Sequence, residues 1–395
     1  MPTAVHHLSI DIETYSDVDI KKAGLYRYAQ SPAFSILLFA YSLDFGPVQA
    51  IDLAQGEQLP PECMARLFDT NTIKHAYNAP FEWYCLSRHF RLWDVPNYPP
   101  EKWLPQWRCT MLHGLYCGCP TGLDAVGKAL GLAEEQQKLS TSKALIRYFC
   151  TPCAPTKTNG QRTRNLPHHD PAKWELFKTY NAQDVVTEME VERRLSAFPV
   201  PDAVQAQWVT DQIINCRGVA VDMDLVDGAL ELDAAARAEY LREAAALSGL
   251  ENPNSVGKLT KWLQAELKEE DIPNLNKTTV TELLGKDLPS EDARRMLELR
   301  QELGKTSNKK YNALETAVCA DGRVRGLLQF YGAARTGRWA GRIVQPQNLP
   351  RTYIRSELLP LARELVEDRQ MDALKVVFGS VPDTLSQLIR TALVA

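Results

Sequence analysis

Two carboxylates lie close together near the start of the chain, in the segment Asp11-Ile12-Glu13 at the end of an apolar run. If this run is a β-strand, residues i and i+2 point to the same face, so both carboxylates converge on one point. Such a pair offers the hard oxygen ligands that Mg²⁺ prefers. The alternative is a solvated strand end, because short acidic motifs of this kind arise often by chance.

Two later segments add further acids and a phenol. The segment from His75 ends in Glu82, and Tyr180 and Asp184 stand four positions apart in a run with helical periodicity. Residues i and i+4 share one helix face, so this phenol and carboxylate can address the same small volume. Together with the first pair, they predict a two-metal site that directs water onto a phosphodiester. Taken singly, Tyr180 and Asp184 could equally be an exposed helix pair.

The elements that must position these groups alternate between strands and helices over the first 200 residues. Apolar runs bounded by turn residues predict strands over 5–12, 34–43 and 72–76. Pro80 opens a predicted helix, and Asp170 with the following proline predicts the start of a helix over 171–195. This alternation favours an α/β domain with a partly buried sheet.

The second half of the chain has a different composition. From 203 to about 320 it is rich in Ala, Leu, Glu and Lys with helical periodicity, which predicts an all-helical domain. Between Lys305 and Arg351 there are nine Lys and Arg against two acids, although the whole chain has a net charge of −4. A basic segment on an acidic body is a candidate phosphate-binding surface, and the alternative is a basic surface loop.

This basic segment contains the side chains that nucleic-acid recognition requires. Glycines let the backbone approach a ligand closely, and Arg335, Arg338 and Arg342 can make charge-assisted bonds to phosphates. Gln347 and Asn348 can donate and accept at base edges or sugars.

In their order, the acidic motifs resemble those of the DEDD superfamily of 3′–5′ exonucleases, in its tyrosine-containing branch, and especially the proofreading domain of family A DNA polymerases. The resemblance implies that two Mg²⁺ or Mn²⁺ ions are bound and that Tyr180 orients the attacking water. The implied metal ligands are Asp11, Glu13, Glu82 and Asp184. The sequence departs from the family at Glu82, where the motif usually ends in Asp.

The basic stretch resembles the thumb–palm junction of phage-type family A polymerases, so that the resemblance covers essentially the whole chain. It implies an α/β ribonuclease H-like exonuclease domain with a mixed central sheet and flanking helices at 1–200. A mainly helical thumb would follow at 201–322, and an incomplete palm at 323–395. The implied DNA contacts are Asn78, Ser255, Lys258, Arg335, Arg338, Arg342, Gln347 and Asn348.

The implied partners are the single-stranded 3′ end of DNA and a primer–template duplex. Because the palm carboxylates of the family are not found, polymerisation by this chain alone is not expected, and a second polypeptide could complete the palm. Two alternatives stay open: a non-catalytic fragment that binds primer–template DNA, and an RNA-trimming exonuclease of the same superfamily.

The composition also indicates the cellular compartment of the protein. We expect no membrane span, because no apolar run reaches about 18 residues, and no secretory leader. Nine scattered cysteines suit a reducing compartment. The resemblance to phage-type polymerases implies the cytoplasm or nucleoid of a bacterial host, with a phage or prophage gene. A zinc cluster is a minor alternative, because the spacing fits no standard finger. Its ligands would come from His113, Cys117, Cys119, Cys150 and Cys153.

Overall fold

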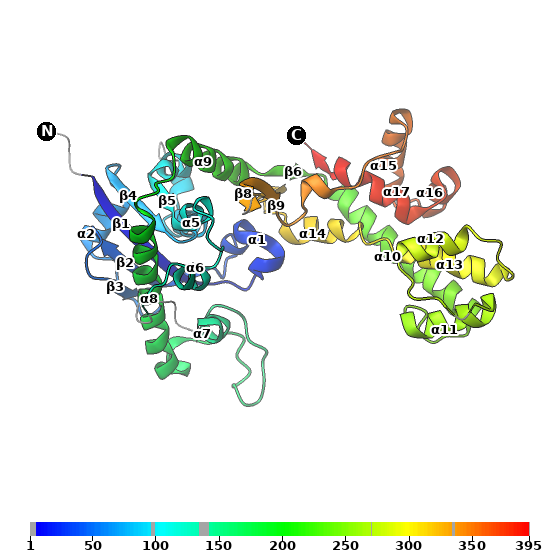
Figure 1. The fold of residues 1–395 in the computed structure, drawn as a ribbon, viewed down its shortest axis with the longest axis horizontal. Helices are drawn as coiled ribbons and strands as arrows, with labels where there is room; N and C mark the ends of the chain where they lie inside the picture. Colours follow the sequence, from blue (N-terminus) through cyan, green and yellow to red (C-terminus); the bar gives the residue numbers. More distant parts are fainter. Residues whose placement is uncertain (1–4, 96–98, 134–141, 270, 334–335, 395) are drawn as a thin grey trace. The chain divides into compact units, whose positions relative to one another are not determined.

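The computed structural model describes residues 5–394 except 96–98, 134–141, 270 and 334–335. The chain forms two compact units (Figure 1). The first unit contains Met1–Gly218 and Arg325–Gln345, and the second contains Val219–Val324 and Pro346–Ala395. The boundaries of these two units differ from those of the three predicted domains. The domain boundaries stay a prediction.

The first unit is built on a mixed sheet of five strands in the order β3-β2-β1-β4-β5. The central strand β1 pairs antiparallel with β2 and parallel with β4, which confirms the predicted mixed sheet. Side chains from both faces of β1 and β2 are buried, which explains why the sequences of these strands are nearly continuous apolar runs. The strands are β1 His6–Tyr15, β2 Ser35–Leu43, β3 Gln49–Asp52, β4 Thr72–Ala76 and β5 Trp107–Cys109.

Helices flank this sheet, and the long helix α8 packs on β1 and β2 (Figure 1). Asp170 caps α8 by accepting the Lys173 amide, and Pro171 is its first residue, as predicted. The α-helices of the first unit are α1 Ile20–Ala29, α2 Pro61–Phe68, α3 Ala79–His89, α4 Pro100–Trp103, α5 Thr110–Tyr116, α6 Leu123–Ala129, α7 Ser142–Phe149, α8 Pro171–Leu195 and α9 Asp202–Arg217.

A β-hairpin from late in the sequence also belongs to the first unit. Its strands are β8 Leu328–Ala333 and β9 Arg338–Gly341. The buried carboxylate of Asp211 on α9 accepts Trp339 Nε1–H at 2.7 Å. The Asn215 side chain exchanges two 2.9 Å hydrogen bonds with the Leu328 backbone. These polar contacts fasten the hairpin to α9.

The second unit is largely helical, as predicted for this part of the chain. Its longest helix, α10, packs against α13, α14, α15 and α17. A Cβ at Gly228 of α10 would lie 2.2 Å from the Val366 carbonyl oxygen, so this close approach to α15 requires glycine. The helices are α10 Met223–Ser248, α11 Val256–Leu267, α12 Lys277–Leu284, α13 Glu291–Leu303, α14 Lys309–Ala317, α15 Leu359–Glu367, α16 Met371–Phe378 and α17 Val381–Leu388.

A small sheet in the order β10-β6-β7 completes the second unit. Its strands are β6 Val219–Val221, β7 Arg323–Val324 and β10 Leu393–Val394. In the part of the chain that the structure describes, none of the helices in either unit is both long and apolar enough to cross a bilayer.

Candidate metal centre

The structure brings three of the predicted acids together. Each of Asp11, Glu13 and Asp184 offers a carboxylate oxygen, and these oxygens lie within 4.8 Å of one another. The first two share a face of β1, just before an irregularity in its pairing with β2, and Asp184 comes from α8. Their role as metal ligands stays a prediction.

Asn181 fixes α8 to β1 beside this cluster. Its side-chain amide donates to Asp11 Oδ2 at 2.7 Å and to the Asp11 backbone oxygen at 3.1 Å. The Asn181 side chain is fully buried, so water does not compete for these bonds. Sequence reasoning did not single out Asn181, and its position directly after Tyr180 in the motif was the available signal.

The residue that follows α7, Cys150, also contacts Glu13. The Cys150 thiol donates to Glu13 Oε2 at 3.7 Å, and both residues are buried. Burial, together with the charge of Glu13, raises the pKa of the Cys150 thiol well above its usual value. The sulfur is therefore protonated at neutral pH and acts as a donor to the carboxylate.

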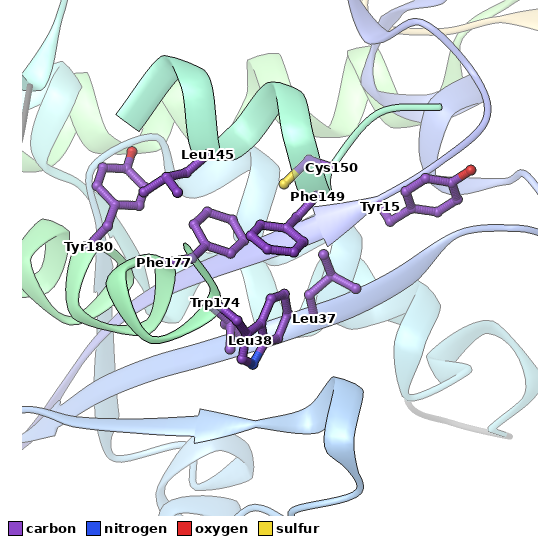
Figure 2. Packing of buried hydrophobic residues seen from close by; sticks show 9 residues of the cluster. All are labelled: Tyr15, Leu37, Leu38, Leu145, Phe149, Cys150, Trp174, Phe177 and Tyr180. Carbon is purple, nitrogen blue, oxygen red and sulfur yellow. The ribbon is translucent and has the colours of Figure 1, made fainter. Parts of the chain in front are cut away.

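Tyr180 lies in a buried apolar cluster that α7 and α8 form over β1 and β2 (Figure 2). Its ring stacks on Phe177 with centroids 6.0 Å apart and an interplanar angle of 2°. Burial, the charges of Glu13, Asp184 and Asp11, and a hydrogen bond with Asp184 all raise the pKa of the Tyr180 phenol. A neutral hydroxyl is thus held at the carboxylate cluster.

Glu82 occupies the first turn of α3 and is 5% exposed. Its Oε2 has no hydrogen-bond partner. Burial, followed by the charge of Asp11, raises the pKa of Glu82 well above the usual value for a glutamate. Glu82 is thus an electrostatic neighbour of the cluster, although it is not one of the three acids that lie within 4.8 Å of one another.

The donor set suits a hard divalent cation. Glu13 and Asp184 are buried, and like charges at this separation repel one another unless a cation or a proton neutralises them. Carboxylate oxygens are the ligands that Mg²⁺ and Mn²⁺ favour. The cluster therefore fits the predicted ions in its chemistry, and it does not by itself identify the metal.

Three predicted DNA contacts of the first unit, Asn78, Arg338 and Arg342, are exposed. Asn78 precedes α3 and lines a cavity of about 530 Å³, as does Arg342. Arg338 is exposed on β9. Arg335 lies outside the described residues.

The other predicted contacts belong to the second unit. Ser255 and Lys258 lie at the start of α11, and Gln347 and Asn348 lie in a short 3₁₀ turn, Pro346–Asn348. Lys258, Gln347 and Asn348 are exposed. The role of these residues in binding DNA stays a prediction.

The minor zinc alternative finds no support among the described residues. The two groups of potential metal ligands found there contain no cysteine. The Cys117 thiol lies 3.7 Å from the Phe198 carbonyl oxygen, and His113 is bonded to that oxygen and to Glu192.

Comparison with known proteins adds a relative and a solved fold. No family model matches the chain. The DNA polymerase of Bacillus phage SP02 is 51% identical over 387 residues, which are 98% of this chain and 57% of that protein. The chain thus spans little more than half the length of this relative.

Among solved structures, the POL domain of Pol1 from M. smegmatis, in complex with DNA primer-template and dNTP, aligns with a TM-score of 0.50. The alignment covers 93% of this chain and 54% of that one at 16% identity, so the likeness is one of fold alone. The chain is therefore a homologue of a phage DNA polymerase, and its fold is similar to that of a bacterial Pol1 domain.

Proposed function

We propose that the first unit is a two-metal 3′–5′ exonuclease of the proofreading type, and that the chain is part of a phage family A DNA polymerase. The observation that carries the proposal is the cluster of Asp11, Glu13 and Asp184, with the hydroxyl of Tyr180 bonded to Asp184. When bound, divalent cations would make water a better nucleophile and stabilise the leaving 3′ oxygen.

The side chains of this chain would divide the remaining work. Asp11, Glu13 and Asp184 hold the cations, while the neutral hydroxyl of Tyr180 orients the attacking water by hydrogen bonding. Glu82 is one methylene longer than the family's aspartate, and its unpartnered Oε2 can accept a hydrogen bond from a water in the site. The apolar cluster that contains Tyr180 excludes bulk water from one side of the three carboxylates.

The direct test is digestion of a 5′-labelled single-stranded DNA with Mg²⁺ or Mn²⁺, beside a matched RNA. A ladder of shortened DNA with little change in the RNA is the expected result. Equal trimming of the RNA would favour an RNA-trimming exonuclease. Salt-sensitive binding to primer–template DNA without any cleavage would favour the non-catalytic fragment.

Tyr180→Phe should slow DNA hydrolysis roughly tenfold to a hundredfold, the range typical of outer-shell partners of a metal site. The variant keeps the ring stacked on Phe177 and removes only the hydroxyl that contacts Asp184. Single-turnover rates measured across a Mn²⁺ titration would check it. We expect a lower maximal rate, with the Mn²⁺ concentration at half-maximal rate unchanged. A wild-type rate would contradict the role of Tyr180 in orienting water.

Arg338→Ala should weaken binding to a primer–template duplex and reduce the slope of log K against log salt by about one. Arg338 is exposed on β9, where its guanidinium can contact phosphate. Hydrolysis of single-stranded DNA should stay nearly unchanged. Arg193→Ala is a matched control, because Arg193 is an exposed arginine of the same unit that pairs with Glu190. Equal losses in both variants would refute a specific contact by the hairpin.

A further inference from the structure

A second group of potential metal ligands lies between the sheet and α8 in the first unit. It consists of His75 on β4 with Glu188 and Glu192 on α8, each offering one ligand atom within 4.8 Å of the others. Glu188 stands one helical turn beyond Asp184, and Glu192 one turn further, so all three acids share one stripe of the helix. The proposed exonuclease mechanism uses neither glutamate.

Two atoms of this group are buried without a partner. His75 is 4% exposed and Glu188 is 2% exposed. In the structure, Nδ1 of His75 and Oε2 of Glu188 have no hydrogen-bond partner. A buried polar atom left without a partner destabilises the fold, and more so when it is charged. A cation bound between this buried imidazole and this buried carboxylate would satisfy both atoms.

Each member of the group is hydrogen-bonded to a neighbour outside it. Nε2 of His75 shares a 2.9 Å hydrogen bond with Nδ1 of His7. Nδ1 of His113 lies 3.0 Å from Glu192 Oε2, and its Nε2 lies 2.9 Å from the Phe198 carbonyl oxygen.

Glu188 is held in a comparable way, because the hydroxyl of Thr110 donates to its Oε1 and the hydroxyl of Ser9 lies beside the same carboxylate. Outer hydrogen bonds of this kind orient the ligands in protein metal sites.

We propose that His75, Glu188 and Glu192 bind one Zn²⁺, which ties β4 to α8 and is separate from the exonuclease metals. An imidazole nitrogen beside carboxylate oxygens suits zinc, whereas Mg²⁺ prefers oxygen ligands alone. The two positive charges of the ion would neutralise both glutamates. Binding would also provide partners for the two unbonded atoms.

A shared proton is the competing explanation for the same geometry. Burial and the charge of Glu192 raise the pKa of Glu188 to about 7, although the hydroxyls of Thr110 and Ser9 lower it, so Glu188 can hold a proton near neutral pH. Burial lowers the pKa of His75 to about 4, so its ring is neutral, the form in which imidazole binds metals. The proton explanation predicts that the apoprotein takes up no zinc at these residues.

The experiment is calorimetric titration of the EDTA-treated full chain with Zn²⁺, in an Asp184→Asn background that weakens the exonuclease site. We expect one tight Zn²⁺ per chain that millimolar Mg²⁺ does not displace. Glu188→Gln in the same background should weaken binding at least about tenfold, and His113→Asn about tenfold to a hundredfold. Zinc bound by the free cysteines would persist in every variant and is subtracted as common background.

Asp52→Asn is the matched control, because Asp52 is a buried, hydrogen-bonded carboxylate of the same unit that lies outside the group. It should bind zinc like its parent. Circular dichroism establishes that each variant is folded. No tight zinc site in the folded parent would overturn the proposal, and so would equal affinity in Glu188→Gln. The exonuclease assay with Mg²⁺ is independent, so either proposal can fail alone.

Discussion

Asp184→Asn should slow the hydrolysis of single-stranded DNA by roughly a thousandfold or more. The substitution keeps the shape of the side chain and removes one of the three charges that would hold the cations. Metal ions contribute several kcal/mol of transition-state stabilisation in such reactions, and each 1.36 kcal/mol is a factor of ten in rate. Without metal, the variant should be at least as stable as the parent, because one of three repelling carboxylates has gone.

Two measurements on the same preparations check this prediction. Single-turnover cleavage of labelled DNA gives the rate, and thermal unfolding with EDTA gives the stability. Glu175→Gln is the control, since Glu175 is an exposed acid of α8 paired with Lys178, and it should cleave like the parent. If Asp184→Asn cleaves at the wild-type rate, the cluster is not the catalytic centre. If it unfolds at lower temperature, the lost rate has a structural cause instead.

The parts of the fold and cluster that follow from local patterns were predictable. The strand that contains Asp11 and Glu13 is recognisable in the sequence as an apolar run. The start of α8 is recognisable by its capping aspartate and the proline in its first turn. The i, i+2 and i, i+4 spacings then indicate which groups share a face, because they depend only on strand and helix geometry. The approach of Asp184 to the first pair needed the family resemblance, since 171 positions separate Asp184 from Glu13.

Contacts that depend on packing could not be predicted in this way. Glu188 and Glu192 resemble surface acids of a charged helix, and only packing against the sheet and α5 buries Glu188, half-buries Glu192 and brings both near His75. The position of the hairpin β8–β9 was equally unpredictable, because its attachment to α9 depends on Asp211, an acid in the middle of that helix. The sequence pattern does not distinguish such a buried acid from a solvated one.

Phe177→Ala should lower the free energy of unfolding of the first unit by about 3–5 kcal/mol, the usual cost of emptying a buried aromatic site. Phe177 is fully buried and stacks on both Tyr180 and Phe149. Urea unfolding followed by tryptophan fluorescence reports mainly on this unit, which contains every tryptophan except Trp262. Phe198→Ala is the control, because that side chain is 67% exposed and should change stability by less than about 0.5 kcal/mol.

The same variant tests whether packing positions the phenol. With Phe177 removed, the ring of Tyr180 loses its stacking partner, so the cleavage rate should fall even at temperatures where the unit stays folded. Phe177→Leu refills most of the volume without the flat stacking surface. It should therefore recover most of the stability and less of the rate. If rate and stability recover in the same proportion, the apolar cluster supports the fold alone and does not specifically orient the hydroxyl beside Asp184.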